Sequence, residues 1–94
     1  MFILRIEHPV PDFENWRKAF DNDPIGRKKS GVTQYRIYRP VDNTRFASIE
    51  LEFQTKQEAE NALDALKRLW KNVEGKVMMD PATSISELIE STTL

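Results

Sequence analysis

Residues 45–53, with the sequence RFASIELEF, carry the most regular strand pattern in the chain. Apolar side chains at the odd positions alternate strictly with other side chains at the even positions, which is the period of a strand with one face on a hydrophobic core. The apolar set is Ala47, Ile49, Leu51 and Phe53, and the other set is Phe46, Ser48, Glu50 and Glu52. The pattern predicts a strand that presents its two glutamates on the face opposite the core.

A long amphipathic helix follows this strand. Thr55 and Glu58 have the spacing of a capping box, in which two side chains satisfy free backbone N–H groups at a helix start. Apolar residues then recur every three or four positions, which predicts one buried helix face. They are Ala59, Ala62, Leu63, Leu66, Leu69, Trp70 and Val73. We expect Gly75 to end the helix, because glycine favours the backbone conformation that follows a last helical turn.

The preceding residues predict a hairpin partner and a first strand. Residues 32–39 alternate in the same way, and the turn-forming residues 40–44 join them to residues 45–53. Residues 2–8 form an earlier alternating segment, in which Leu4 and Ile6 share the apolar side. Each of these strands is expected to have one face on the core.

A short helix is expected between the first strand and the hairpin. Asp12 has the position of a helix N-cap, and Phe13, Trp16 and Phe20 follow at helical spacing. We expect Asp23 to cap one further, very short helical turn before Gly31. After a weak apolar bend around Met78 and Met79, residues 84–90 alternate as a last strand.

The order strand, helix, strand, strand, helix, strand is that of a ferredoxin-like fold. With no linker or low-complexity stretch, residues 1–94 form a single α+β domain of type βαββαβ. Right-handed crossovers place the first and third strands in the centre of a four-stranded antiparallel sheet, with both helices on one face. The other face of the sheet is left open.

Composition excludes several classes of function. The chain has 94 residues, 39% of them hydrophobic and 31% charged, with no cysteine and a formal net charge of −1. The near-neutral charge gives no electrostatic reason to bind nucleic acid or an anionic membrane. With no long apolar run, neither a membrane span nor a signal peptide is expected, and the expected location is cytoplasmic. One histidine and scattered carboxylates predict no metal site, and single glycines predict no phosphate loop or cofactor.

The open face is expected to mix apolar and charged side chains. Strand parity assigns to it Ile3, Arg5, Glu7, Gln34, Arg36, Tyr38, Phe46, Ser48, Glu50, Glu52 and Leu88. The two arginines can pair with the three glutamates across neighbouring strands, and pairing becomes compulsory if the face is buried. Since a domain of this length buries only about two thirds of its unfolded surface, self-association through this face is energetically attractive.

Over nearly its whole length the chain resembles the dimeric α+β barrel superfamily, and within it the small antibiotic-biosynthesis-monooxygenase-like proteins. The resemblance is carried by residues 8–13 (HPVPDF) with Trp16 and Phe20, by Arg27 to Val32, by Tyr35 to Arg39, and by the apolar helix from Ala59 to Trp70. It implies a homodimer in which two sheets pack face to face, and many such relatives have no assigned activity. Haem-degrading members use an asparagine near the end of the first strand, where this chain has Glu7 or His8. They also use a histidine after the second helix, and here none follows Trp70, which argues against haem oxygenation.

Four residues are candidates for a site. His8 could transfer protons, because its ordinary pKa lies near neutrality, and Glu50 could act as a second carboxylate. Arg36 and Tyr38 could hold an anionic or phenolic ligand. Each has a structural alternative: His8 could bond a backbone carbonyl, and the other three could set the register of a dimer interface. The two tryptophans could stack on a flat ligand or pack in the core.

Two functions of different class follow. The first is a homodimeric α+β barrel that binds or transforms a small aromatic or polyketide-like molecule, in a lumen between the two sheets or between sheet and helices, by monooxygenase- or cyclase-like chemistry. The second is a non-catalytic dimerisation or ligand-sensing module. Whether the chain is an enzyme is left open by the sequence, and resemblance at the level of fold does not decide it.

Overall fold

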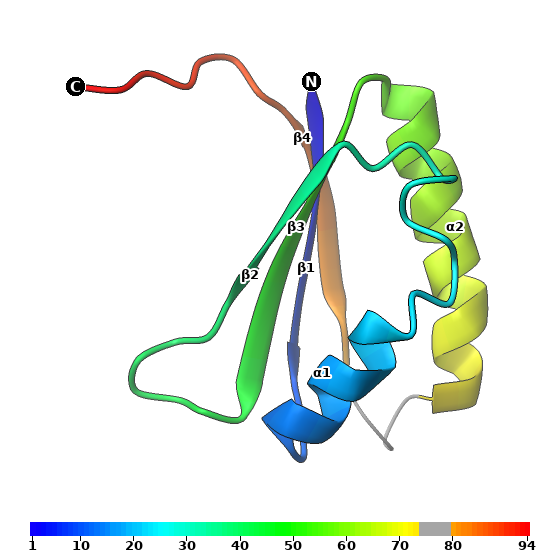
Figure 1. Cartoon of the computed structure of the whole chain (residues 1–94), viewed down its shortest axis with the longest axis vertical. Helices are drawn as coiled ribbons and strands as arrows, with labels where there is room; N and C mark the ends of the chain where they lie inside the picture. The colour runs from blue at the N-terminus through cyan, green and yellow to red at the C-terminus, as the bar shows by residue number, and fades with distance from the viewer. Residues whose placement is uncertain (74–79) are drawn as a thin grey trace.

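The structure is a computed structural model that describes residues 1–73 and 80–94. Four strands and two helices alternate along the chain in the order β1, α1, β2, β3, α2, β4 (Figure 1). Their bounds are Phe2–Pro9 for β1, Phe13–Asp21 for α1, Gln34–Tyr38 for β2, Phe46–Phe53 for β3, Lys56–Val73 for α2 and Ala82–Glu87 for β4. The predicted βαββαβ order is confirmed.

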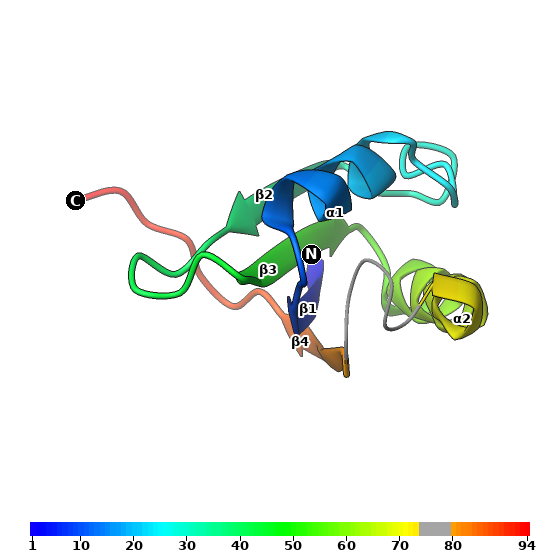
Figure 2. The same ribbon diagram turned by 90° about the horizontal axis from the view of Figure 1, so that it is seen from below.

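The four strands form one antiparallel sheet in the order β2-β3-β1-β4. The first and third strands are therefore central, as predicted. The register places Arg5 of β1 opposite Glu50 of β3, and Glu50 opposite Arg36 of β2. Both helices lie on the same face of the sheet (Figure 2).

The hydrophobic core lies between this face and the helices. The odd positions of β3 are almost fully buried, as are Leu4, Ile6 and His8 at even positions of β1, which confirms the predicted strand parity. The buried apolar residues are Leu4, Ile6, Val10, Trp16, Ala47, Ile49, Leu51, Phe53, Ala59, Ala62 and Trp70.

Side-chain caps fix where both helices begin. The Asp12 carboxylate accepts from the backbone N–H groups of Glu14 at 3.0 Å and Asn15 at 3.4 Å, and so caps α1. At the start of α2 the Glu58 backbone N–H donates to the Thr55 hydroxyl at 3.1 Å, while the Thr55 backbone N–H donates to the Glu58 carboxylate at 3.3 Å. This reciprocal pair is the predicted capping box.

The segment between α1 and β2 differs from the prediction. The expected helical turn after Asp23 is wrong: residues 24–31 form successive turns, because Asp23 and Gly26 take left-handed backbone conformations, with φ of 52° and 65°. Gly31 also has a positive φ, of 100°. The Asp23 carboxylate nevertheless caps this segment by accepting from the Arg27 backbone N–H at 2.8 Å.

The strand limits also differ: β1 ends one residue later than expected, at Pro9, and β3 begins one residue later, at Phe46. The second strand spans residues 34–38 rather than 32–39, and the last spans 82–87 rather than 84–90, because Ala82 already pairs with Glu7. The predicted helix stop at Gly75 and the bend at Met78 and Met79 lie outside the described residues.

Candidate functional site

The open face carries a network of charged side chains across three strands. Glu50 is at its centre, with Arg36 on β2 and Arg5 on β1 to either side. One Glu50 oxygen accepts from Arg36 Nε and from the Tyr38 hydroxyl, each at 3.0 Å, and the other accepts from Arg5 Nη1. Arg36 Nη1 also donates to Glu52 at 2.9 Å. Three of the four predicted site residues therefore meet in one network.

The network holds Glu50 as an anion. Burial by itself would raise the pKa of Glu50, but hydrogen bonds from Arg36 and Tyr38, with the charges of Arg5 and Arg36, lower this pKa below its ordinary value. The same bonds to Glu50 and Glu52 raise the pKa of Arg36, so its charge is permanent. A carboxylate held ionised by three donors is suited to fixing neighbouring strands, whereas a general acid needs a raised pKa.

His8 lies on the opposite face of the sheet from this network. It shares the core side with Leu4 and Ile6, is only 1% exposed, and contacts the ring of Trp16 edge-on at a centroid distance of 5.7 Å. Its Nδ1 donates to the Pro9 carbonyl at 3.2 Å, which is the structural alternative foreseen for it. Burial lowers the pKa of His8 despite this bond, so the imidazole is neutral near neutrality. The structure does not bring His8 together with Glu50.

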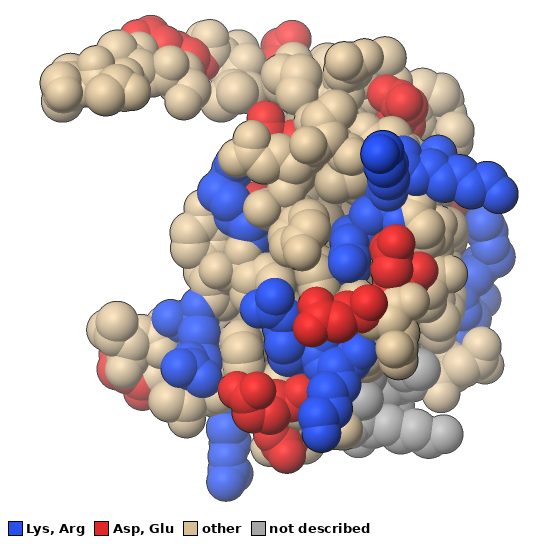
Figure 3. Space-filling view, in the orientation of Figure 1, with Lys and Arg blue, Asp and Glu red and all other residues tan. Residues whose placement is uncertain are grey.

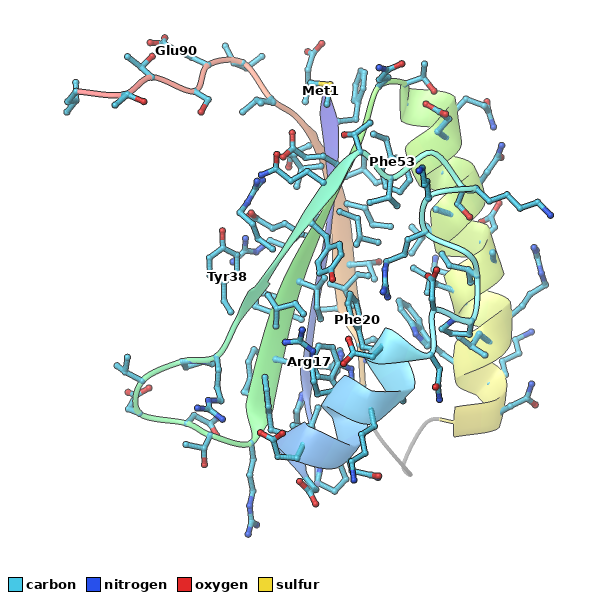
Figure 4. All side chains as sticks on the ribbon, viewed as in Figure 1. Met1, Arg17, Phe20, Tyr38, Phe53 and Glu90 are labelled. Carbon is cyan, nitrogen blue, oxygen red and sulfur yellow. The ribbon has the colours of Figure 1, made fainter. Side chains whose placement is uncertain are left out.

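A cavity of about 260 Å³ opens between the helices and the sheet. Its walls come from the core faces of β1 and β3, from α1, from α2 and from the connection after α1. The lining residues are Ile6, Trp16, Ala19, Phe20, Asn22, Asp23, Pro24, Ile25, Arg27, Ile49, Leu51, Leu66, Leu69 and Trp70. Figure 4 places Phe20 on this helix side of the sheet, while Tyr38 points to the open side. The cavity and the charge network are therefore on different faces.

Trp16 and Phe20 give the cavity an aromatic wall and belong to a longer series of rings. Phe13, Trp16, Phe20 and Tyr35 contact each other in series, with successive centroid distances of 5.4, 5.4 and 5.2 Å. The first three are the aromatic stripe of α1, and Tyr35 joins them from β2. Both tryptophans of the chain, Trp16 and Trp70, line the cavity and are also part of the buried core. The two interpretations given to them by sequence are therefore compatible.

The polar groups of the lining are gathered at one end. Asn22, Asp23 and Arg27 all belong to the connection after α1. The Arg27 guanidinium carbon lies 4.0 Å from the centroid of the Phe20 ring and 4.9 Å from that of Tyr35. Its Nη1 donates to the Phe20 carbonyl at 2.7 Å, and its Nε lies 3.5 Å from the Asp23 carboxylate. This arrangement holds a cation in place beside an apolar space.

Sequence reasoning missed Arg27 as a site residue. Its side chain is only 16% exposed, although Arg27 stands beside Lys28 and Lys29 in the sequence. One feature of the sequence could have indicated that Arg27 is a site residue. It stands eleven residues after Trp16, in the segment that joins the aromatic helix to the next strand.

No metal centre is found in the part of the chain that the structure describes, where no three histidine or acidic side chains are grouped. Among the same residues, no helix has both the length and the apolar character needed to cross a membrane.

No protein-family model and no curated protein matches the sequence, but solved structures do. A protein of unknown function from Nitrosomonas europaea has a TM-score of 0.76 at 10% identity, over 99% of this chain and 93% of that chain. A dimeric ferredoxin-like protein from an uncultured marine organism has a TM-score of 0.67 at 10% identity, with 97% of each chain covered. An antibiotic biosynthesis monooxygenase has a TM-score of 0.69 at 7% identity, over 96% of this chain and 100% of that chain.

These comparisons define the class of fold. The chain has the ferredoxin-like fold that dimeric ferredoxin-like proteins and antibiotic-biosynthesis-monooxygenase-like proteins share, and some of these neighbours have no known function. The resemblance predicted from the sequence is confirmed at this level. At identities of 10% or less the likeness extends to the fold and not to the reaction.

Proposed function

We propose that this chain is a homodimeric protein whose sheet–helix cavity binds a small, flat, aromatic molecule with one polar or acidic end. The observation that carries this proposal is the division of the cavity into an aromatic wall and a polar end at Asn22, Asp23 and Arg27. Pockets for small molecules combine a mostly apolar lining with a few placed polar groups that fix orientation.

The size of the cavity limits its ligand. At about 260 Å³ it is slightly smaller than the usual range of ligand sites, which begins near 300 Å³, and this size suits a molecule of one or two aromatic rings. Trp16, Phe20 and Trp70 offer ring faces and edges for stacking. At the polar end Arg27 can donate to a carboxylate or phenolate oxygen, since a guanidinium has five N–H groups in a fixed plane.

The homodimer is supported by the open sheet face and by the neighbours described as dimeric ferredoxin-like proteins. In such a dimer the charge network of Arg5, Arg36 and Glu50 would lie at the interface. The reaction would take place in the sheet–helix cavity of each subunit, either as monooxygenase-like chemistry, suggested by neighbours of that name, or as cyclase-like chemistry.

A non-catalytic ligand-sensing module is the second candidate. It is favoured by the hydrogen bonds on the open face. Glu50 already accepts from Arg5, Arg36 and Tyr38, so these side chains are engaged with one another. This network can set the register of an interface without any reaction. Under this alternative the cavity binds its ligand and releases it unchanged.

The test is a thermal-shift screen of aromatic acids, phenols and quinones, each paired with a neutral isostere, because a ligand that binds only the folded state raises Tm. Hits are repeated on Ala19→Phe, which fills the cavity, and on Ala65→Phe, the same change on α2 outside the lining. We expect Ala19→Phe to abolish the shift and Ala65→Phe to retain it. Equal shifts in both variants would refute binding in this cavity.

A second measurement separates an enzyme from a sensing module. The hits are incubated with the protein under air, and the mixture is analysed for reaction products.

A further inference from the structure

The C-terminal segment leaves the sheet without packing on its own chain. After β4 the Leu88 backbone N–H donates to the Met1 carbonyl at 2.9 Å. Residues 89–94 then form neither helix nor strand, and Ile89 is 83% exposed while Leu94 is fully exposed. In Figures 1 and 2 this segment runs away from the body, on the side to which the β2–β3 connection also projects.

The segment borders a hollow over the open face. Figure 3 shows the space-filling surface as a concave outline, closed on one side by the C-terminal segment and on the other by the projecting β2–β3 connection. Tyr38, and with it the edge of the charge network, points toward this hollow (Figure 4). A partner molecule bound in the hollow would therefore contact both the sheet and the C-terminal segment.

The sequence of the segment suits an extended partner-binding arm. Residues 88–94 read LIESTTL, with aliphatic and β-branched side chains, one charge and neither glycine nor proline, a composition enriched in strands. At roughly 3.3 Å per residue, the six residues 89–94 that follow Leu88 reach about 20 Å. A four-stranded sheet with strands about 4.8 Å apart is about 14 Å wide. The segment is thus long enough to cross a second sheet.

We infer that residues 88–94 are an arm that packs on a second copy of this chain, burying Ile89 and Leu94 against it while that copy covers the open face. The inference rests on the proposed homodimer. Charge favours a second copy as the occupant, because Arg5 and Arg36 pair with Glu7, Glu50 and Glu52 inside one chain. Although two arginines face three glutamates, each of these five side chains has a partner of opposite charge, so the face can be buried against itself with no unpaired ion.

Two-fold symmetry makes the contact reciprocal. In an isologous dimer each arm would lie on the other subunit, so every dimer would contain two such contacts. The arms would then slow dissociation, since both must detach before the subunits separate. Removing them should leave the folded subunit intact, because residues 89–94 make no backbone hydrogen bond to the rest of the described chain.

The first experiment measures the dimer dissociation constant by sedimentation for four chains: the full chain, the chain ending at Leu88, Ile89→Ser with Leu94→Ser, and the control Ser91→Ala with Thr93→Ala. We expect at least a tenfold rise for the shortened chain and for the serine variant, and less than a twofold change for the control. An unchanged constant in the shortened chain overturns the arm but leaves the homodimer standing. A full chain that stays monomeric at all concentrations overturns both, whereas ligand binding in the cavity is judged by its own thermal-shift test.

The second experiment locates the arm directly. A photoreactive phenylalanine analogue replaces Thr93, and equal amounts of ¹⁵N-labelled and unlabelled chains are mixed, exchanged and irradiated. The inference predicts crosslinked peptides that join the two isotopic forms. Crosslinks confined to one isotopic form within each peptide pair would show that the arm folds back on its own chain and would overturn it.

Discussion

The Arg27 guanidinium packs on the rings of Phe20 and Tyr35 at the polar end of the cavity, beside an apolar space. Its neighbour Lys28 carries the same charge but does not line the cavity. These two residues form a matched pair, because their replacement by glutamine changes the net charge equally. Selectivity for an acidic ligand should depend on the first of them only.

We expect Arg27→Gln to weaken binding of acidic aromatic ligands by about tenfold to a hundredfold, since a charge-assisted hydrogen bond contributes about 1.5–3 kcal/mol. Binding of the neutral isosteres should change little. Calorimetric titration of Arg27→Gln and Lys28→Gln with each ligand pair provides the measurement. Equal losses in the two variants would mean that long-range charge, and not contact at the cavity end, attracts the ligand.

His8 predicts a dependence of stability on pH. Its pKa is lowered in the folded protein and ordinary, about 6.5, in the unfolded chain. The unfolded chain therefore binds more protons below that pH, and the free energy of unfolding falls as pH decreases through 6.5 toward the folded-state pKa.

Urea unfolding at pH 7.5 and pH 5.5 measures this effect, with His8→Gln as the comparison. The wild-type chain should lose stability at the lower pH, and the variant should lose clearly less. A wild-type chain that is equally stable at both pH values would contradict the neutral, buried state of the imidazole.

At the scale of elements, Gly31 determines how the segment after α1 joins β2. Its φ of 100° is left-handed, and a Cβ atom there would overlap the Glu58 carboxylate that caps α2. Gly26 also has a positive φ, but a Cβ there would meet only Lys29 Cβ at 3.6 Å. We expect Gly31→Ala to cost about 2–3 kcal/mol and Gly26→Ala about 1 kcal/mol in free energy of unfolding. Urea unfolding tests this order, and a reversed order would show that the cap can move aside freely.

The central strand offers a second test. Glu50→Gln removes the charge that binds Arg5 and Arg36, whereas Ser48→Ala removes a buried hydroxyl that has no hydrogen-bond partner among the described residues. We expect Glu50→Gln to lower the free energy of unfolding by about 1–2 kcal/mol and to weaken the dimer, and Ser48→Ala to change neither.

Measuring ligand binding and dimerisation together shows whether the open face belongs to a ligand site or to the dimer interface. If Glu50→Gln or Arg36→Gln removes ligand binding while the dimer stays intact, the open face takes part in the ligand site. If both weaken the dimer and leave ligand binding in place, the network serves the interface. Sedimentation and thermal shift on the same samples provide the two readouts.

The elements could be predicted where short-range chemistry decides them. The strand β3 and the Thr55–Glu58 cap could be predicted from the sequence, because each depends on residues only a few positions apart. The segment after α1 could not, since Asp23 there takes a left-handed backbone conformation that sequence alone rarely specifies. Arg27 was missed for a different reason: its burial depends on Phe20 and Tyr35, which the fold brings to it from two different elements.

At the scale of the whole molecule, the sheet separates two environments. One face and the helices enclose an apolar cavity, and the other face carries a saturated charge network beside a free C-terminal arm. The division explains why the four residues predicted as one site could not all meet: His8 follows the parity of Leu4 and Ile6, whereas Glu50, Arg36 and Tyr38 follow the other parity. Their roles in catalysis or ligand binding stay predictions.

The most direct measurement uses the only two tryptophans of the chain, because Trp16 and Trp70 both line the cavity. A ¹⁵N-labelled sample gives two indole N–H signals, which are followed by NMR during titration with the best aromatic acid from the screen. Ligand binding in the cavity predicts that both indole signals move in a saturable way, while the arginine side-chain signals of Arg5 and Arg36 on the open face stay in place. Unmoved indole signals together with shifted Arg5 and Arg36 signals would contradict it, since the ligand would then lie on the other face of the sheet.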